Sequence, residues 1–362
     1  MRILLVEIHD RNSWSMRRYY KSILESLQQS NYEIKIVKNI DLKVLNFNLI
    51  SPRINYYLES WIFKSMNIIR ISRRNDILYF TDTSDAGVIS LLLHSFFKIR
   101  HIKVVTTTHD LYGVLASRNK IPHVRIGQMG RLLQSLIVLG LNYSTLNLAV
   151  SNEAKRQSSS LIPNIRTKVL HNPIHTDHSY SKQVNKSLPN NFATLIMEPD
   201  WRKDRDSSIQ LWVELHKALN DLYLIIVGSP LTEKESKLIL NFEKYLIIKN
   251  HLTENELNEL YSQSRFNIFL SKYEGFGYPI LEANILGKPS IVYNTRHFKE
   301  IGGEDNIYID IDSKIEVGWL VNSLELVNTD RLKVRAKNLF SIEEFQSRQI
   351  YLLNEMIKSE NI

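Results

Sequence analysis

The chain alternates between short, continuously apolar runs and longer stretches in which apolar residues recur at helical spacing. Continuous apolar runs are typical of parallel strands that are buried on both faces. The runs lie at residues 3–8, 34–37, 77–80, 104–107, 148–150, 194–197, 222–227, 266–270 and 290–292. Between them, Trp212 and Leu215 belong to a helical face that we expect Asp206 to cap, and Thr253 with Glu256 forms a capping box. The alternation predicts an α/β fold of the doubly wound, parallel-sheet type.

The alternation breaks once, where residues 171–192 are polar, contain two prolines and lack periodicity. We interpret residues 173–192 as a linker between an N-terminal Rossmann-like domain (1–172) and a C-terminal one (193–340). Ligands of such sheets bind beyond the carboxyl ends of the strands. Two sheets that face each other would therefore share one cleft.

Composition and charge narrow the possible partners. The chain has 362 residues, of which 43% are hydrophobic and 23% charged, as in globular proteins of two domains. It has no cysteine, which excludes disulfides and thiolate sites. The net charge of +8 favours phosphate-bearing partners: nucleotides, nucleic acid or an anionic membrane. No signal peptide or spanning segment is evident, so we expect a cytoplasmic protein or one peripheral on the inner face of the plasma membrane.

Residues 271–283, SKYEGFGYPILEA, carry the most informative pattern. Gly275 and Gly277 permit a tight loop after the strand, and Pro279 suits the first position of a helix. Such a loop presents backbone N–H groups at a helix N-terminus, which favours a diphosphate. Glu274 and Glu282 bracket the loop and are suited to accepting sugar hydroxyls. The alternative is that Glu282 only complements the helix dipole and Glu274 is solvated. A dinucleotide fingerprint is excluded because Ile280 replaces the third glycine.

The stretch EGFGYPILEANILGKPSIV resembles the signature of retaining family-4 glycosyltransferases, the glycosyl transferases group 1, which have the GT-B fold. The resemblance implies that Glu274 contacts donor-sugar hydroxyls and Glu282 the ribose. It also implies that the sugar diphosphate is held by the loop. The implied donor-binding loop residues are Gly275, Phe276, Gly277, Tyr278 and Pro279.

Two further segments are similar to the family. Asp200-Trp-Arg-Lys-Asp occupies the place where the family grips the diphosphate with an Arg and a Lys, here the adjacent Arg202 and Lys203. Cations there would stabilise the charge that develops on the leaving group, although a solvated basic turn remains the alternative. The segment Thr106–Leu111 is similar to the family's His-Asp segment, which implies that His109 reaches the donor sugar. Asp110 either orients the imidazole or supports the loop. The tail from Phe340 onward, residues 341–362, resembles the family's last helix, which crosses back onto the first domain.

The chain departs from the family in its first turn, which has no glycine. His9, Arg11 and Asn12 could supply acceptor contacts there, or they only cap the helix that follows. His171, His175, Asp177 and His178 suggest a metal cluster, but Pro173 and the linker composition argue against one, and we expect no metal.

Basic and aromatic residues interleave in two further segments. Residues 52–74 contain Tyr56, Tyr57, Trp61, Phe63, Arg70, Arg73 and Arg74, and a second segment contains Arg118, Lys120, Arg125 and Arg131. They would suit an anionic membrane that carries a lipid-linked acceptor, or they are ordinary solvated helix faces. Binding to nucleic acid is not favoured, because no known module collects the basic residues.

Together these observations predict a glycosyltransferase, with the donor on the C-terminal domain and the acceptor on the N-terminal one. The family resemblance implies that it transfers a hexose with retention. We expect GDP-mannose or a UDP-hexose as the donor and a glycan or lipid-linked acceptor, in cell-envelope polysaccharide, lipopolysaccharide or glycolipid assembly. We expect no cofactor beyond the nucleotide-sugar co-substrate. The alternatives are another GT-B activity such as an epimerase or inverting transferase, a catalytically silent nucleotide-sugar-binding scaffold, and a basic membrane-surface protein.

Overall fold

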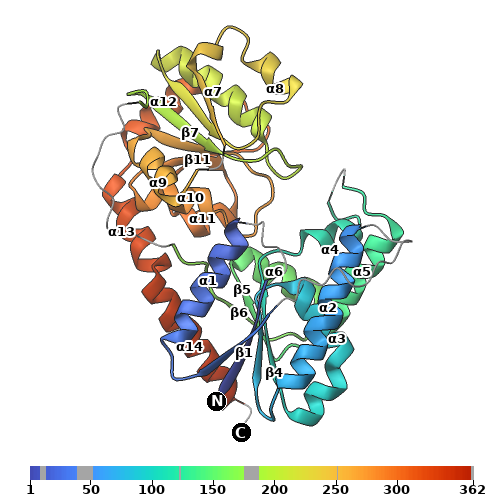
Figure 1. Cartoon of the computed structure of the whole chain (residues 1–362). Helices are drawn as coiled ribbons and strands as arrows, with labels where there is room; N and C mark the ends of the chain where they lie inside the picture. Colours follow the sequence, from blue (N-terminus) through green and yellow to red (C-terminus); the bar gives the residue numbers. More distant parts are fainter. Residues whose placement is uncertain (9–13, 39–51, 122–123, 175–186, 251, 360–362) are drawn as a thin grey trace. The chain divides into compact units, whose positions relative to one another are not determined.

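A computed structural model of the protein describes residues 1–8, 14–38, 52–121, 124–174, 187–250 and 252–359. The chain divides into unit 1, made of Met1–Pro173 and Ile342–Ile362, and unit 2, made of Ile174–Ser341. Each unit contains one six-stranded parallel sheet with helices on both faces (Figure 1). The predicted doubly wound α/β class is therefore confirmed.

The sheet of unit 1 has the strand order β2-β1-β3-β4-β5-β6. Its strands are β1 (Arg2–Val6), β2 (Glu33–Val37), β3 (Ile77–Phe80), β4 (Lys103–Thr108), β5 (Leu146–Ala149) and β6 (Thr167–Val169). Its helices are α1 (Trp14–Gln28), α2 (Pro52–Ile71), α3 (Thr83–Arg100), α4 (Tyr112–Ser117), α5 (Gln128–Leu141), α6 (Asn152–Leu161) and α14 (Ile342–Lys358). Helices α1 and α14 lie on one side of this sheet, and α2, α3 and α5 lie on the other (Figure 1).

Helix α14 completes the core of unit 1 although it lies at the far end of the sequence. Its inward side chains join β1 and α1 in one buried cluster, and Gln349 donates to the Tyr79 hydroxyl at 3.2 Å. The contributing residues of α14 are Phe345, Leu352, Leu353 and Met356. Because these side chains are fully or almost fully buried, unit 1 depends on the C-terminal helix for its hydrophobic stabilisation.

The sheet of unit 2 has the strand order β12-β11-β10-β7-β8-β9. Its strands are β7 (Phe192–Ile196), β8 (Tyr223–Val227), β9 (Leu246–Lys249), β10 (Phe266–Phe269), β11 (Ser290–Tyr293) and β12 (Ile307–Ile309). Its helices are α7 (Arg205–Leu219), α8 (Glu233–Leu238), the short 3₁₀ helix Glu243–Tyr245, α9 (Glu254–Gln263), α10 (Tyr278–Ile285), α11 (Arg296–Gly302), α12 (Val317–Glu325) and α13 (Thr329–Phe340).

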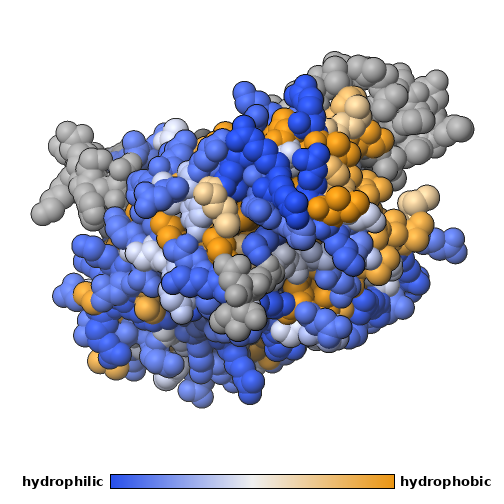
Figure 2. Space-filling view, turned by 90° about the horizontal axis from the view of Figure 1, so that it is seen from below, coloured by the Kyte–Doolittle hydropathy of each residue, from blue (hydrophilic) through white to orange (hydrophobic). Residues whose placement is uncertain are grey.

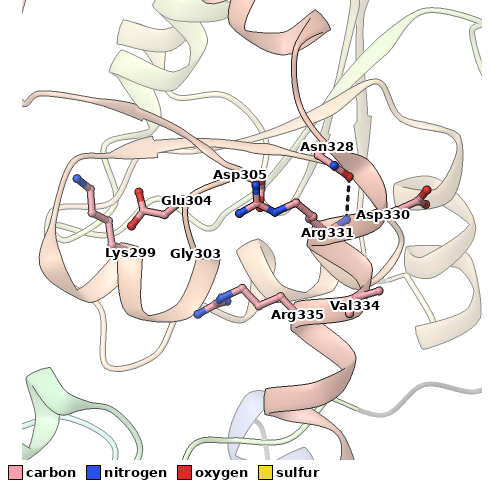
Figure 3. Close-up of a pocket in the computed structure, with 9 residues that line it drawn as sticks. All are labelled: Lys299, Gly303, Glu304, Asp305, Asn328, Asp330, Arg331, Val334 and Arg335. Atoms are coloured by element: carbon pink, nitrogen blue, oxygen red, sulfur yellow. Dashed lines mark hydrogen bonds and ion pairs between the residues drawn. The ribbon is translucent and has the colours of Figure 1, made fainter.

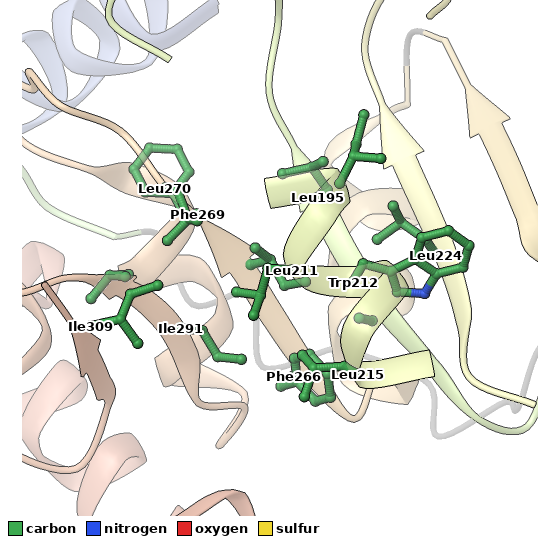
Figure 4. Close-up of a cluster of buried hydrophobic side chains, with 14 of the residues drawn as sticks. Leu195, Leu211, Trp212, Leu215, Leu224, Phe266, Phe269, Leu270, Ile291 and Ile309 are labelled. Carbon is green, nitrogen blue, oxygen red and sulfur yellow. The ribbon is translucent and has the colours of Figure 1, made fainter. Parts of the chain in front are cut away.

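The core of unit 2 forms where the apolar face of α7 meets the sheet (Figure 4). Trp212 is fully buried, and its indole N–H donates to the Leu222 carbonyl at 3.1 Å. The helical face predicted from the sequence is therefore the buried one. The expected N-cap was wrong, because α7 begins at Arg205 and is preceded by Asp204, which places Asp206 inside the first turn.

The sequence pattern missed three strands, β6, β9 and β12, and all three lie at sheet edges. β6 has the sequence TKV and is only partly buried, so it lacks the continuous apolar run that marks a central strand. β9 (LIIK) and β12 (IYI) carry short apolar runs that the sequence analysis did not select. The capping box at Thr253 and Glu256 is confirmed, with the Glu256 amide donating to the Thr253 hydroxyl at 3.3 Å.

The chain passes between the two units at Pro173/Ile174 and again at Ser341/Ile342. The Ile174 amide donates to the Phe340 carbonyl at 2.7 Å, so these crossing points are neighbours. Residues 175–186 of the segment that we interpret as a linker lie outside the described residues.

Candidate functional site

The loop between β10 and α10 lies at the carboxyl edge of the unit 2 sheet. Gly277 precedes the helix with φ 105° and ψ 50°, a left-handed conformation that favours glycine. The helix begins at Tyr278, so Pro279 is its second residue and not the first, as the sequence had suggested. No side chain caps this end of α10, and a helix N-terminus without a side-chain cap is suited to an anion.

A second loop, which follows β7, is paired with the first. The Lys272 amide donates to the Arg202 carbonyl at 2.8 Å, and the Asp204 amide donates to the Leu270 carbonyl at 2.9 Å. Lys203 and Ser271 form an isolated antiparallel bridge between the two segments. The structure thus brings together two motifs that the sequence analysis had identified separately.

Lys203 and Glu274 form an ion pair where the two loops meet. Their side chains are only 17% and 12% exposed, so water screens the pair less than it would at the surface. The Lys203 ammonium also lies 4.7 Å from the centroid of the Phe269 ring, which favours a cation at this position. A cation and a carboxylate are therefore held next to the glycine loop.

Arg202 points to a different partner from its neighbour Lys203. Its guanidinium Nε donates to Asp200 Oδ1 at 3.1 Å, and its amide donates to the same oxygen at 2.9 Å. Burial disfavours the charged form of this carboxylate, but the hydrogen bonds from Arg202 outweigh it and lower the pKa of Asp200. Arg202 thus pairs with Asp200, and Lys203 pairs with Glu274.

Glu282 and Phe276 hold the loop and helix from the interior. The Glu282 side chain is almost fully buried on α10, where the Tyr261 hydroxyl donates to it at 3.4 Å. The Phe276 ring is buried against Tyr278 and Phe340, with centroid distances of 5.3 and 5.9 Å. The two glutamates that bracket the loop therefore occupy different surroundings, one paired with lysine and one enclosed beside a tyrosine.

Three residues beneath the loops were not identified from the sequence. Asp204 receives a hydrogen bond from the Tyr293 hydroxyl at 2.8 Å and an ion pair from Lys272 at 2.9 Å. Burial opposes the ionised form of Asp204, but these two partners prevail and lower its pKa. The carboxylate thereby ties together the ends of β7, β10 and β11. No local sequence signal marks it, because its partners lie far away in the chain.

Arg205 and Glu235 form a second cross-link in unit 2. The guanidinium makes two hydrogen bonds to the carboxylate, at 2.6 and 2.5 Å, and both side chains are 2% exposed. It also donates to the carbonyls of Ser229 and Pro230, at 3.0 and 2.8 Å, and so holds the loop that follows β8. The capping box of Thr232 and Glu235 is visible in the sequence and could have marked this helix start.

In unit 1, His109 follows β4 and is held by backbone and aromatic contacts. Its Nε2 lies 3.1 Å from the Thr81 carbonyl, and its ring meets Tyr19 edge-on at 4.7 Å. Burial lowers the pKa of His109 to about 4, partly opposed by the hydrogen bond to Thr81. The imidazole is therefore neutral at pH 7. Asp110 accepts from the Tyr112 amide at 3.2 Å, a contact that supports the start of α4.

A buried charge cluster that the sequence analysis missed lies at the same edge of unit 1. Lys64 is fully buried, pairs with Asp85, and donates to the Glu7 carbonyl at 2.9 Å. Trp61, which we had grouped with the candidate surface aromatics, is also buried and donates to Asp85 at 2.9 Å. Burial and the Asp85 carboxylate raise the pKa of Asp82 to about 7, against the lowering effect of Lys64. Long-range contacts alone reveal this cluster.

Some residues named from the sequence cannot be placed. His9, Arg11 and Asn12 lie outside the described residues, as do His175, Asp177 and His178. Among the residues that the structure describes, no group of three or more His, Asp or Glu side chains is arranged to hold a metal ion.

Unit 2 also has a cavity of about 710 Å³ between α11 and α13 (Figure 3). Its cations already have partners within the protein: Arg331 pairs with Asp305 at 3.3 Å, and Arg335 donates to the carbonyls at the end of α11. The lining residue Gly303 follows α11 and leads toward the amino end of β12. The cavity therefore lies at the sheet edge opposite to the glycine loop, and both of its arginines are engaged within the protein.

Comparison with known proteins agrees with this geometry. Residues 178–337 match the family model described as Glycosyl transferases group 1. The serotype-specific mannosyltransferase WbdA of Escherichia coli is 29% identical over 163 residues, which cover 44% of this chain and 20% of that protein. The match thus spans about a fifth of the length of this curated relative.

Solved structures resemble the whole chain in fold. Sucrose-phosphate synthase (tll1590) from Thermosynechococcus elongatus has a TM-score of 0.72 at 14% identity and covers 99% of this chain and 100% of its own. Anabaena Alr3699/HepE, solved in complex with UDP and glucose, has a TM-score of 0.68 at 14% identity, with coverage of 98% and 100%. The predicted GT-B fold and the resemblance to glycosyl transferases group 1 are confirmed.

Proposed function

We propose that this chain, whose residues 178–337 match the glycosyl transferases group 1 model and whose fold is GT-B, transfers a hexose from a nucleotide-sugar donor to a hydroxyl acceptor. Mannose is our preferred sugar, because the curated relative WbdA is a mannosyltransferase. The same relative, which is serotype-specific, supports a role in the assembly of cell-envelope polysaccharide.

The observation that carries the proposal is the Lys203–Glu274 pair beside the N-terminus of α10. The ammonium and the amide groups that follow Gly277 favour an anion, and the carboxylate accepts hydrogen bonds from hydroxyls. A sugar diphosphate carries an anionic diphosphate and sugar hydroxyls next to each other, and so presents a ligand for each of these groups. As the glycosidic bond breaks, negative charge grows on the diphosphate, and Lys203 would stabilise it most in the transition state.

We assign the remaining donor contacts by the same chemistry. The loop from Gly275 to Pro279 would hold the diphosphate through its backbone, and Glu282 would accept from the ribose once the nucleotide displaces its present surroundings. Arg202 would add a second positive charge by turning away from Asp200, with which it now pairs. We propose that transfer proceeds with retention, with the leaving phosphate assisting deprotonation of the acceptor. NMR of the product anomer tests this point.

We propose that unit 1 binds the acceptor, a glycan or a lipid-linked sugar. If Nε2 of His109 donates to the Thr81 carbonyl, Nδ1 is left as a hydrogen-bond acceptor in the neutral ring. A neutral imidazole with a fixed tautomer is suited to orienting a sugar hydroxyl. No cofactor or metal is needed in this scheme, because Lys203 and the helix N-terminus serve the diphosphate; activity that EDTA abolishes would contradict it.

The test is a thermal-shift screen of the full chain against UDP, GDP and ADP and their hexose conjugates. We expect one nucleotide family to raise Tm, because a ligand that binds only the folded state stabilises it. Lys203→Met should abolish the shift. Lys217→Met is the matched control, because Lys217 forms an exposed pair with Glu214 at 2.7 Å on the same unit. If no nucleotide raises Tm, or if the Lys203 variant shows the same rise as wild type, the assignment of this donor site is wrong.

A further inference from the structure

Exposed apolar side chains gather on three neighbouring helices of unit 1. Nine of the nineteen large apolar side chains that are exposed in the described part of the chain lie on α2, α3 and α5. Figure 2 shows orange side chains toward the right, the side on which Figure 1 places these helices. Isolated exposed apolar residues are normal, but a cluster of this kind marks an interaction surface.

Helix α5 carries the clearest row. Met129, Leu132, Leu136 and Leu139 follow one another at spacings of three or four residues and are between 37% and 67% exposed. Residues at this spacing lie on one face of a helix. Since Ile137, Val138 and Leu141 on the other side of α5 are buried in the core, the row faces outward.

Helices α2 and α3 carry parallel rows. Ile62, Met66 and Ile69 on α2 are spaced by four and three residues and are between 42% and 60% exposed. Leu92 and Ile99 on α3 lie two turns apart and are 60% and 75% exposed. The core-facing side of α3 is buried separately, so these residues are not part of the hydrophobic core.

Close packing joins the rows into one surface. A Cβ atom added to Gly140 of α5 would lie 1.7 Å from the Gly87 carbonyl oxygen of α3, so the two helix backbones touch. Helix α2 contributes Trp61 and Ile68 to the same cluster as Ile89 and Phe97 of α3. We call the outward side of α2, α3 and α5 the three-helix face.

The exposed charged side chains that the structure describes around the three-helix face are all positive. Residues 60–121 and 124–145 include nine exposed cations: Arg70, Arg73, Arg74, Lys98, Arg100, Arg118, Lys120, Arg125 and Arg131. The acidic residues of these ranges are Asp76, Asp82, Asp85 and Asp110, and none of them is exposed. Because nine exposed cations face no exposed acidic residue within these ranges, the surface potential here is positive.

The cations lie at both ends of the helices, with the apolar rows between them. At the C-terminal ends of α2 and α3, Arg74 contacts His101 at 3.0 Å, which places these two basic segments together. At the N-terminal end of α5, Arg131 contacts Asn119 at 3.3 Å and so lies beside the loop that carries Arg118 and Lys120. An apolar strip flanked by cations matches the layering of an interface between lipid headgroups and acyl chains.

We propose that the three-helix face docks the protein on a bilayer that contains anionic phospholipid. No helix in the described part of the chain is both long and apolar enough to cross a membrane, so we propose that the three-helix face lies on the membrane surface. A second copy of the chain would set like charges against each other on this face. A nucleic acid would satisfy the cations but leave the apolar rows in water. An anionic bilayer accommodates both features.

The docking proposal does not depend on the donor chemistry, but it bears on the acceptor. Helix α4 begins three residues after His109, and the basic loop 118–120 follows α4 directly. The basic end of the three-helix face is therefore close in the chain to the acceptor-side histidine of the proposed function. A docked protein would meet a lipid-linked acceptor at that end.

The test is sedimentation of the full chain with vesicles of phosphatidylcholine alone and of phosphatidylcholine with phosphatidylglycerol in equal parts. We expect binding only to the anionic vesicles, and weaker binding as the Debye length falls from about 10 Å at 0.1 M salt to about 3 Å at 1 M. The double variant Leu132→Gln with Leu136→Gln should bind about tenfold more weakly, because its apolar row is interrupted. Lys120→Glu with Arg125→Glu should weaken binding to a similar degree.

Leu326→Gln is the control, because Leu326 is 84% exposed and belongs to unit 2, whereas the three-helix face belongs to unit 1. All substituted residues are exposed, so Tm should stay unchanged and separate a folding defect from a docking defect. The proposal is overturned if the wild-type chain ignores anionic vesicles or if the leucine variant binds as tightly as wild type. Self-association in sedimentation velocity that the same variant abolishes would assign the face to a second copy.

Discussion

Glu274→Gln should change nucleotide binding and sugar transfer in opposite directions. The Glu274 carboxylate pairs with the ammonium of Lys203. The amide keeps the size of the side chain and removes its negative charge. The lysine is then free to meet the diphosphate, and the repulsion between the carboxylate and the incoming phosphates disappears. A nucleoside diphosphate without sugar should therefore bind more tightly.

The magnitude follows from the environment of the pair. Opposite unit charges about 4 Å apart attract by about 4 kcal/mol at an effective dielectric constant near 20. Both side chains retain some contact with water, at 17% and 12% exposure, and separating the pair recovers part of their hydration. A net change of about 1 kcal/mol remains, close to the upper values for exposed pairs, and this corresponds to about fivefold tighter binding.

Transfer should fall because the sugar hydroxyls lose a charged acceptor. The loss of such a hydrogen bond costs roughly 1.5–3 kcal/mol, or about 10- to 100-fold in kcat/KM if it is felt in the transition state. Calorimetry with the nucleoside diphosphate and initial rates with the nucleotide sugar measure the two effects separately. Lys203→Met should lower both the affinity for the nucleoside diphosphate and the kcat/KM of sugar transfer. Glu214→Gln, in the exposed pair with Lys217, should alter neither.

The reasoning is refuted if Glu274→Gln leaves diphosphate affinity unchanged or weakens it. Lys203 would then be a structural partner of Glu274 and not a ligand of the diphosphate. Full transfer activity in the same variant would separately remove Glu274 from the sugar site.

Four further predictions concern stability and are measured by thermal or denaturant unfolding. Asp85→Asn should destabilise the protein, because the buried Lys64 loses the carboxylate that pairs with it; without the Asp85 charge the pKa of Asp82 should fall and Asp82 should supply a partial counter-charge, so the loss should stay below the roughly 3–5 kcal/mol of an uncompensated buried charge. Asp82→Asn, by contrast, should be tolerated. Folded Asp82 keeps its proton up to about pH 7, whereas the unfolded chain releases it near pH 4. The wild-type protein should therefore lose stability as the pH rises from about 4 to 7, and the variant should not. His109 has a pKa of about 4 in the folded protein, so between about pH 6.5 and 4 only the unfolded chain binds a proton at this residue. The free energy of unfolding should fall by up to roughly 3 kcal/mol as the pH drops through this window. A His109→Gln variant with the same pH dependence of stability would show that His109 is not its cause. Gly277→Ala should cost about 1–3 kcal/mol because φ is +105°, whereas Gly318→Ala, with open space around it in α12, should stabilise slightly; equal effects would contradict the strain argument.

The sequence by itself determined the architecture of each unit. Central strands such as β3 and β10 carry continuous apolar runs, because both faces of a parallel sheet are covered by helices. The glycine loop could also be predicted from the sequence, because Gly277 and Pro279 restrict the local backbone conformation independently of distant residues. The edge strand β6 escaped detection because its sequence, TKV, is partly buried and contains no apolar run.

Only the tertiary structure decided which polar side chains meet. Lys203 and Arg202 are adjacent in sequence, yet one pairs with Glu274 and the other with Asp200. The charged cluster around Lys64 depends on how α2 lies against α3, and the place of α14 depends on the core of unit 1. Periodicity reports which face of an element is buried, because each element must cover its apolar side. It does not report register or partner, because these follow from contacts between segments that are many residues apart.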